Sequence, residues 1–325
     1  MLIRNHDTND KVLVIAEIGN AHEGGYLTAL MMICAAAQAG ADAVKFQRFI
    51  PELYDSRPER IEKLKRWCFD DGDWEYLAKY AHICGVAFIC TPFDLESAEK
   101  LAPIVDAFKI SSGDCGWGDF VDKILSYKIP TIVSTGGQTE SELGEWVGDY
   151  DGENLAFLHC ISGYPVPDGD ALLHDIREWC EATVGNGEVG YSDHTEGITA
   201  PIAAVALGAR IIEKHFTINS KGVDAAVSLE PSEFAEMVHQ IRRVEKMLGD
   251  GEKRIMPCEE PVLFHMHRSI RAKGNLPEGH EIKMSDLTWT RPADGLPPGE
   301  EDRIVGVRTK WAIRKNATIT EGDVE

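Results

Sequence analysis

Short, mostly apolar runs recur along the first two-thirds of the chain, and each is followed by a stretch with helical character. The runs are continuous rather than alternating in hydrophobicity, which is typical of parallel strands covered on both faces. Eight strand–helix units in about 250 residues favour a closed (β/α)8 TIM barrel over an open sheet. The predicted strands are 12–19, 43–49, 88–93, 107–113, 131–136, 155–160, 188–193 and 210–217.

Three of the predicted helix-to-strand joins share one chemistry. In each, a helix rich in small residues runs into a glycine, and a strand begins within two residues. Glycine adopts the left-handed conformation that ends a helix without steric cost, so we expect helix C-termini at these positions. The joins lie at 35–45, 80–88 and 203–213, and their glycines are Gly40, Gly85 and Gly208.

The pattern changes after 248–251, where strands become short and turns dense. We predict a barrel domain at 1–255, a linker with two prolines at 256–266 and a small β-rich domain at 267–325. Within the small domain, 270–287 resembles 311–324. A domain of this size buries little surface alone, so we expect it to dock on a larger one.

Charge and composition exclude several classes of partner. The 325 residues include 33 basic and 54 acidic side chains, a net charge of −21, which repels nucleic acid and anionic membranes. Any site for an anion must therefore be made positive locally. No apolar run is long enough to span a membrane, and the N-terminus lacks a signal-peptide core, so we expect a cytoplasmic protein. The eight cysteines form no C-x-x-C pair, which argues against a disulfide framework and a four-thiolate zinc site.

Polar side chains cluster at the carboxyl ends of the predicted strands, where barrel enzymes carry their reactive groups. Two lysines with several hydroxyls could cradle a phosphate and a carboxylate. Any one of these residues alone is better explained as part of a solvated loop. The set is Glu17, Lys45, Gln47, Thr91, Lys109, Ser111, Ser112, Ser134, Thr135, His159, Tyr164, Ser192, His194, Glu213 and His215.

His194 and His215 follow the last two predicted strands and could share a metal ion. Taken singly, each is more simply an ordinary core or surface histidine. Imidazole favours borderline transition metals, and two such ligands leave positions open for substrate. That arrangement suits Lewis-acid activation of a carbonyl and not a closed structural zinc site. Glu17, in an apolar strand, is either paired with a lysine or poised as a general base.

Taken in order, these motifs resemble the N-acetylneuraminate (sialic acid) synthase family. The tail, through 268–269, 291–295 and 304–306, is similar to that family's C-terminal antifreeze-like (SAF) domain. The barrel motifs are 16–19 with 22–24, 44–47, 91–93, 109–113, 134–136, 164–165, 192–195, 213–217, and Asp224 before 228–231.

The resemblance implies condensation of phosphoenolpyruvate with the open-chain aldehyde of an N-acylated mannose-type sugar. The products are a nine-carbon 2-keto sugar acid, such as N-acetylneuraminate, and phosphate released with C–O cleavage. It also implies a divalent ion, Mn²⁺ with Mg²⁺ or Co²⁺ as alternatives, held by His194 and His215 to polarise the aldehyde.

The resemblance also implies a role for each matching residue. Glu17 would handle the proton or water, and Tyr164 and Asp224 would hold the sugar. Arg291 would reach the sugar from the SAF domain of a second subunit, in a domain-swapped homodimer. The residues implied for phosphoenolpyruvate are Lys45, Thr91, Lys109, Ser112, Asp114, Ser134, Ser162 and Ser192.

Three positions depart from the family pattern. Ala21 and Ser162 stand where the family often has Asn, and Asp114 stands where it often has Glu. Because these positions touch the substrate pockets, the sugar stays open. N-acetylmannosamine, a diacetamido-trideoxyhexose leading to legionaminic or pseudaminic acid, and a 6-phosphorylated sugar leading to N-acetylneuraminate-9-phosphate are the alternatives. A metal-dependent aldolase, an aldo-heptulosonate-type synthase and a non-enzymatic carbohydrate-binding protein are the rival functions.

Overall fold

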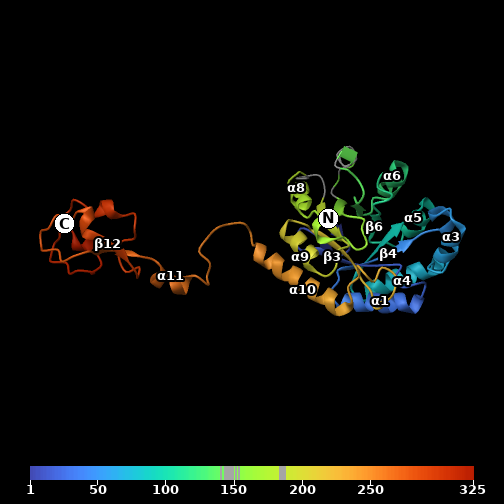
Figure 1. Cartoon of the computed structure of the whole chain (residues 1–325), viewed down its shortest axis with the longest axis horizontal. Helices are drawn as coiled ribbons and strands as arrows, with labels where there is room; N and C mark the ends of the chain where they lie inside the picture. The colour runs from blue at the N-terminus through green and yellow to red at the C-terminus, as the bar shows by residue number, and fades with distance from the viewer. Residues whose placement is uncertain (140, 143–149, 151, 153, 183–187) are drawn as a thin grey trace. The chain divides into compact units, whose positions relative to one another are not determined.

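The computed structural model describes residues 1–139, 141–142, 150, 152, 154–182 and 188–325 (Figure 1). Within it the chain forms two compact units, Met1–Gly249 and Asp250–Glu325. The unit boundary falls a few residues before the predicted domain boundary at 255.

Eight parallel strands close into a barrel in the first unit, which confirms the predicted (β/α)8 architecture. Each strand pairs with its neighbours along the chain, and β10 returns to β3 to close the sheet. The strands are β3 (Leu13–Gly19), β4 (Ala43–Arg48), β5 (Ala87–Pro92), β6 (Ala107–Ile110), β7 (Thr131–Ser134), β8 (Leu155–Cys160), β9 (Glu188–Asp193) and β10 (Ile211–His215).

Several strands end earlier than the sequence pattern indicated. The strand expected at 107–113 ends at Ile110, the last residue paired with β7, and the strand expected at 131–136 ends at Ser134. Ser111, Ser112 and Thr135 therefore lie in the loops that follow. These loops leave the sheet at the carboxyl ends of the strands, where backbone is free to carry functional groups.

Helices surround the strands, as the ribbon in Figure 1 shows. None of the helices in the described part of the chain combines the length and apolar character of a membrane span. The helices of the first unit are α1 (Tyr26–Gln38), α2 (Pro51–Tyr54), α3 (Pro58–Lys65), α4 (Asp71–Ile83), α5 (Leu95–Leu101), α6 (Gly118–Ser126), α8 (His174–Ala182), α9 (Thr199–Ala206) and α10 (Pro231–Leu248).

The three predicted helix ends are confirmed. Gly40, Gly85 and Gly208 all have positive φ, of 91°, 88° and 114°. In each case the amide after the glycine donates to the carbonyl five residues earlier, as Ala41 does to Ala36 at 3.0 Å. This backbone arrangement caps the helix and turns the chain toward the next strand.

Alternate residues along the barrel strands point to opposite faces of the sheet and form two apolar layers. Residues such as Val14 and Phe46 face outward and pack in the large core beneath the helices. Residues such as Leu13, Ile15 and Ile89 form a second cluster inside the barrel. Two short strands, β1 (Leu2–Ile3) and β2 (His6–Asp7), precede the barrel, and Ile3 joins this inner cluster. The inner layer is therefore filled, and only its carboxyl end is left for polar groups.

The second unit begins with helix α11 (Glu260–Met266), which occupies most of the predicted linker. The rest is built from β11 (Ser269–Ala272), β12 (Leu287–Thr290), isolated bridges and 3₁₀ turns around its own apolar core. The two similar stretches pair with each other, since Leu276 and Ile313 exchange backbone hydrogen bonds of 2.8 Å. Each stretch also ends in a capped 3₁₀ turn, η2 (Met284–Asp286) and η4 (Glu321–Asp323).

Candidate active site

One inward-facing residue from each of the eight strands forms the floor of a cavity of about 840 Å³. Each lies near the carboxyl end of its strand, above the apolar inner cluster. A strand alternates its side chains between two faces, so this parity selects the residues that enter the cavity. They are Glu17, Lys45, Thr91, Lys109, Ser134, Cys160, Ser192 and Glu213.

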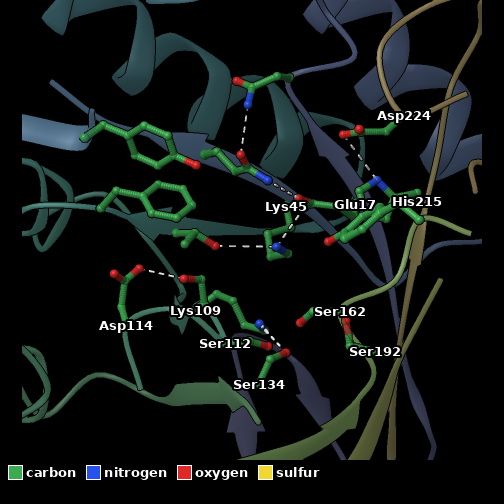
Figure 2. Close-up of a pocket in the computed structure, with 18 of the residues that line it drawn as sticks. Glu17, Lys45, Lys109, Ser112, Asp114, Ser134, Ser162, Ser192, His215 and Asp224 are labelled. Atoms are coloured by element: carbon green, nitrogen blue, oxygen red, sulfur yellow. Dashed lines mark hydrogen bonds and ion pairs between the residues drawn. The ribbon is translucent and has the colours of Figure 1, made fainter. Parts of the chain in front are cut away.

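The floor holds two lysines and two carboxylates, all buried. Lys45 Nζ lies 3.0 Å from Glu17 Oε2 and 3.3 Å from Glu213 Oε1 (Figure 2). Lys109 Nζ lies 3.9 Å from Glu213 Oε2. Both interpretations of Glu17 raised by the sequence are therefore compatible with its position, because it pairs with a lysine and also faces the cavity.

Burial and neighbouring charge move the two carboxylates in opposite directions. Burial raises the pKa of Glu17, and the Glu213 charge adds to this increase although Lys45 opposes it. For Glu213, burial also raises the pKa, but Lys109 and Lys45 outweigh it and hold the pKa below its usual value. Two carboxyl groups whose pKa values are driven apart can divide the roles of acid and anion between them.

A chain of amides orients Glu17. Gln47 Nε2 donates to Glu17 Oε1 at 2.9 Å, and Asn20 Nδ2 donates to Gln47 Oε1 at 2.9 Å. Asn20 also lines the cavity, whereas Ala21 is packed in the apolar core.

Hydroxyls and a backbone amide surround Lys109. Its ammonium donates to Ser134 Oγ at 2.6 Å, and Ser112 Oγ accepts from the Gly136 amide at 2.9 Å. A Cβ at Gly136 would lie 2.4 Å from Ser162 Oγ and 3.0 Å from Ser112 Oγ, so alanine there would displace these hydroxyls. These groups gather on one side of the cavity around the two lysines (Figure 2), and they can receive an anionic ligand.

The two candidate metal ligands lie together on the cavity wall. The ring centroids of His194 and His215 are 5.3 Å apart. Two imidazoles bound to one ion at about 2.1 Å place their centroids about 4.6–5.3 Å apart for octahedral or tetrahedral angles. His194 Nδ1 donates to the Ile161 carbonyl at 2.8 Å, which leaves Nε2 free as a ligand atom. The pair therefore fits a shared divalent ion.

The electrostatics of His215 suit the same role. Burial and the nearby charges of His194, Lys45 and Lys214 hold its pKa well below the usual value, so the ring is neutral. For His194, burial lowers the pKa but its contact with the Cys160 thiol raises it. The described part of the chain contains no cluster of three or more His, Cys, Asp or Glu residues placed to hold a metal ion, so His194 and His215 have no third such ligand beside them. Two protein ligands leave the remaining coordination positions open.

A buried ion pair outside the barrel positions the loop that carries His194. Lys214 Nζ lies 2.6 Å from Asp193 Oδ2 and donates to the Thr195 carbonyl at 2.5 Å. The two partners alternate with the functional residues along β9 and β10, so they face the helices and not the cavity.

The loops that follow β6, β8 and β10 add Asp114, Ser162, Tyr164 and Asp224 to the lining of the cavity. The Tyr164 ring lies 4.1 Å from that of His194, and Asp224 Oδ2 lies 3.9 Å from His215 Nδ1. Burial raises the pKa of both Asp224 and Asp114, and Asp114 accepts a hydrogen bond from Ser111 at 2.6 Å. The other barrel residues expected at the site are brought to this one cavity, except Thr135 and His159. Thr135 Oγ1 instead donates to the Leu158 carbonyl at 3.0 Å, and His159 Nε2 forms a hydrogen bond of 2.9 Å with the Ala171 carbonyl, because its side chain faces away from the barrel interior.

Arg291 stands apart from this set. It follows β12 in the second unit and is exposed. Its contact with the sugar was expected across a dimer, and it stays a prediction.

Two kinds of residue were missed as site residues by sequence reasoning. Glu213 and Gln47 were predicted only as polar strand ends without a role. Each lies two residues from an expected site residue of its own strand, His215 and Lys45, and therefore on the same face, which was a usable signal. Arg57, Arg60 and Lys63 also line the cavity, from a segment between β4 and α4 that no strand pattern marks.

Comparison with known proteins gives one consistent result across most of the chain. The model of the NeuB family matches residues 32–253, and the SAF domain model matches 267–325. An uncharacterised protein of Methanocaldococcus jannaschii is 40% identical over 88% of this chain and 87% of its own length. The N,N'-diacetyllegionaminic acid synthase of Campylobacter jejuni is 34% identical, covering 91% and 95%. The structure of N-acetylneuraminic acid synthetase from Leptospira borgpetersenii matches with a TM-score of 0.74 and 32% identity, over 80% of this chain and 94% of that one.

Proposed function

This chain belongs to the NeuB family, as its motifs predicted, and from that premise we propose that it is a nonulosonic acid synthase. It condenses phosphoenolpyruvate with the open-chain aldehyde of an acylamino sugar and releases phosphate. The names of its relatives, which include a diacetyllegionaminic acid synthase and an N-acetylneuraminic acid synthetase, support this reaction class.

The observation that carries the proposal is the buried pair of lysines in a strongly acidic protein. Lys45 and Lys109 lie on the floor of a cavity within a chain of net charge −21. Phosphoenolpyruvate carries a phosphate and a carboxylate, so it supplies two anionic groups for two cations. Thr91, Ser134 and Ser192 add hydroxyls at the same level.

His194 and His215 would hold a divalent ion, most suitably Mn²⁺, which supplies Lewis acidity at the aldehyde oxygen. The chain's own residues position the reactants around it. Tyr164 and Asp224 lie beside the histidines and would hold the sugar with its aldehyde carbon toward the floor. The enol carbon then forms a new C–C bond to the aldehyde carbon.

Glu17 handles the proton chemistry at the former enol carbon. Water adds to the oxocarbenium carbon and loses a proton, the C–O bond to phosphate breaks, and phosphate leaves. Glu17 is buried beside Lys45, and its raised pKa matches a group that exchanges a proton during the cycle. Lys45 offsets the negative charge that Glu17 carries when it is ionised.

The reaction is tested by phosphate release from phosphoenolpyruvate with Mn²⁺ and a panel of 2-acetamido sugars. We expect release with at least one sugar, with product mass giving its identity, and no 2-keto sugar acid formed when pyruvate replaces phosphoenolpyruvate. His194→Ala should abolish release, whereas the exposed His239→Ala serves as a matched control. No release with any sugar would refute the reaction, and pyruvate incorporation would favour the aldolase.

We further propose a domain-swapped homodimer in which Arg291 of one subunit contacts the sugar bound by the other. Loss of a charge-assisted hydrogen bond costs about 1.5–3 kcal/mol, so Arg291→Ala should raise the KM for the sugar and leave that for phosphoenolpyruvate unchanged. An unchanged sugar KM, or a monomer by light scattering, would contradict this arrangement.

A further inference from the structure

The loop that carries Arg291 begins beside a buried serine. Strands β11 and β12 pair in antiparallel register, with Ser269 opposite Thr290, the last residue of β12. The residues that follow, 291–295, are here called the Arg291 loop. The Arg291 side chain is exposed, and no hydrogen bond or ion pair engages its guanidinium within the described part of the chain. The guanidinium is therefore available to a ligand, and the conformation of the loop decides where it points.

The hydroxyl of Ser269 binds three backbone groups of the Arg291 loop. Ser269 Oγ donates to the Pro292 carbonyl at 2.9 Å and accepts from the amides of Asp294 and Gly295 at 2.9 and 3.0 Å. A hydroxyl offers one donor and two acceptor sites, so this set uses all of them. Ser269 is fully buried, which keeps water from replacing these bonds. The hydrogen-bonding capacity of this side chain therefore serves the shape of the loop.

Arg271, on the same face of β11, supports the loop through its side chain. Arg271 Nη2 lies 2.5 Å from Asp294 Oδ1, and Nη1 donates to Thr318 Oγ1 at 2.6 Å. Thr318 Oγ1 donates in turn to Asp294 Oδ1 at 2.9 Å, so the three side chains form a closed triangle. Arg271 is buried in this triangle, and hydrogen bonds between charged groups are stronger than neutral ones. The triangle therefore fixes the part of the loop that follows Arg291.

The backbone of the Arg291 loop has further contacts within the second unit. The Ala293 amide donates to the Phe264 carbonyl of α11 at 2.8 Å. A Cβ at Gly295 would lie 2.0 Å from Thr318 Cγ2, which shows how closely the loop packs on the segment behind it. Ordinary surface loops have few such contacts and are mobile. The Arg291 loop is instead a rigid support for an exposed and unpaired guanidinium.

We propose that Ser269 and Arg271 are positioning residues, which hold the Arg291 loop in the conformation that directs Arg291 to the sugar. This inference rests on the proposed function, in which Arg291 contacts the sugar bound by the other subunit. A binding group on a rigid support loses less conformational entropy when its ligand arrives. Loosening the loop should therefore weaken sugar binding and leave the chemistry at the barrel unchanged.

The test measures steady-state kinetics of the full-length protein with phosphoenolpyruvate and Mn²⁺. The sugar is whichever wild type uses best among N-acetylmannosamine, its 6-phosphate and a 2,4-diacetamido-trideoxyhexose. Ser269→Ala should raise the KM for the sugar about fivefold, because it removes the hydrogen bonds that shape the loop. The kcat and the KM for phosphoenolpyruvate should change less than about twofold. Asp294→Ala, at a partly exposed side chain, should raise the sugar KM about threefold and serves if Ser269→Ala does not fold.

Thr309→Val is a matched control for the loss of a buried hydroxyl in the same unit. Thr309 is buried, and its Oγ1 donates to the Pro277 carbonyl at 2.7 Å and accepts from the His280 amide at 3.1 Å. Both partners lie outside the Arg291 loop, so the control should keep the sugar KM of wild type. An equal increase in Thr309→Val and Ser269→Ala would show a general defect of the unit and overturn the proposal.

A double-mutant cycle with Arg291→Ala separates positioning from general support. If Ser269 acts through Arg291, adding Ser269→Ala or Asp294→Ala to Arg291→Ala should leave the sugar KM unchanged. The same increase in both backgrounds would overturn the proposal. Hydrogen exchange without substrate gives a second readout, because the amides of Asp294 and Gly295 should exchange about tenfold faster in Ser269→Ala than in Thr309→Val. Equal exchange in the two variants would also overturn it.

The outcomes separate this inference from the proposed reaction. If wild type releases phosphate but Ser269→Ala and Asp294→Ala keep its sugar KM, the positioning role is refuted while the synthase reaction stands. If Arg291→Ala itself keeps that KM, the contact of Arg291 with the sugar is refuted and the positioning role falls with it. If no sugar reacts with wild type, the reaction is refuted, and the role of the Arg291 loop in it is refuted too.

Discussion

Replacing Lys45 with methionine tests the charge balance at the floor of the cavity. The substitution keeps the length of the side chain and removes a buried cation that lies 3.0 Å from Glu17 and 3.3 Å from Glu213. At an effective dielectric of about 20, the attraction lost at 3.0 Å is about 5.5 kcal/mol. Removing one partner of a buried pair typically costs about 3–5 kcal/mol, and we expect a loss in that range at pH 7.

The loss should depend on pH in a direction set by Glu17. Its pKa is already raised in the folded protein, so its ionisation destabilises the fold as pH increases through that pKa. Without Lys45 the pKa rises further. The destabilisation by Lys45→Met should therefore be largest at pH 8 and shrink as pH falls, because protonation of Glu17 removes the unpaired charge.

A double variant separates this electrostatic cost from a packing defect. Lys45→Met/Glu17→Gln removes both partners and should recover most of the stability at pH 7. The free energy of unfolding is measured in urea by circular dichroism at 222 nm. This signal reports chiefly the helices of the barrel, because α11, with seven residues, is the single α-helix among the described elements of the second unit. A single-variant loss below about 1 kcal/mol, or an equal loss at pH 5 and pH 8, would refute the reasoning.

Three further substitutions probe other parts of the fold. Asp42 is partly buried, which raises its pKa, but hydrogen bonding to His6 and the charge of Arg242 lower it to about 2. Asp42→Asn should therefore cost about 2 kcal/mol at pH 7, and the difference in urea unfolding should disappear as pH falls toward 2. Gly136→Ala should raise the KM for phosphoenolpyruvate about tenfold, because its Cβ would displace the Ser162 and Ser112 hydroxyls; an unchanged KM contradicts this. Glu17→Gln should abolish phosphate release yet leave the melting temperature at pH 8 equal to or above that of wild type, and a lower one would show that the ionised group stabilises the fold.

The sequence alone determined the architecture of the barrel. Continuous apolar runs, with glycines such as Gly40 and Gly208 at the helix ends, specify buried parallel strands because each local signal has one steric solution. The order of polar residues after these runs also identified the family. The parity of residues along each strand further predicts which of them enter the barrel, as Glu17 and Lys45 do.

Only the tertiary structure decided how these groups act on one another. The opposite pKa shifts of Glu17 and Glu213 arise because strands distant in sequence place both carboxylates beside one lysine. The path of the chain between β4 and α4, a segment without strand periodicity, is what brings Arg57, Arg60 and Lys63 to the cavity. Distances and burial set electrostatic energies, and neither is encoded in the local pattern of the chain.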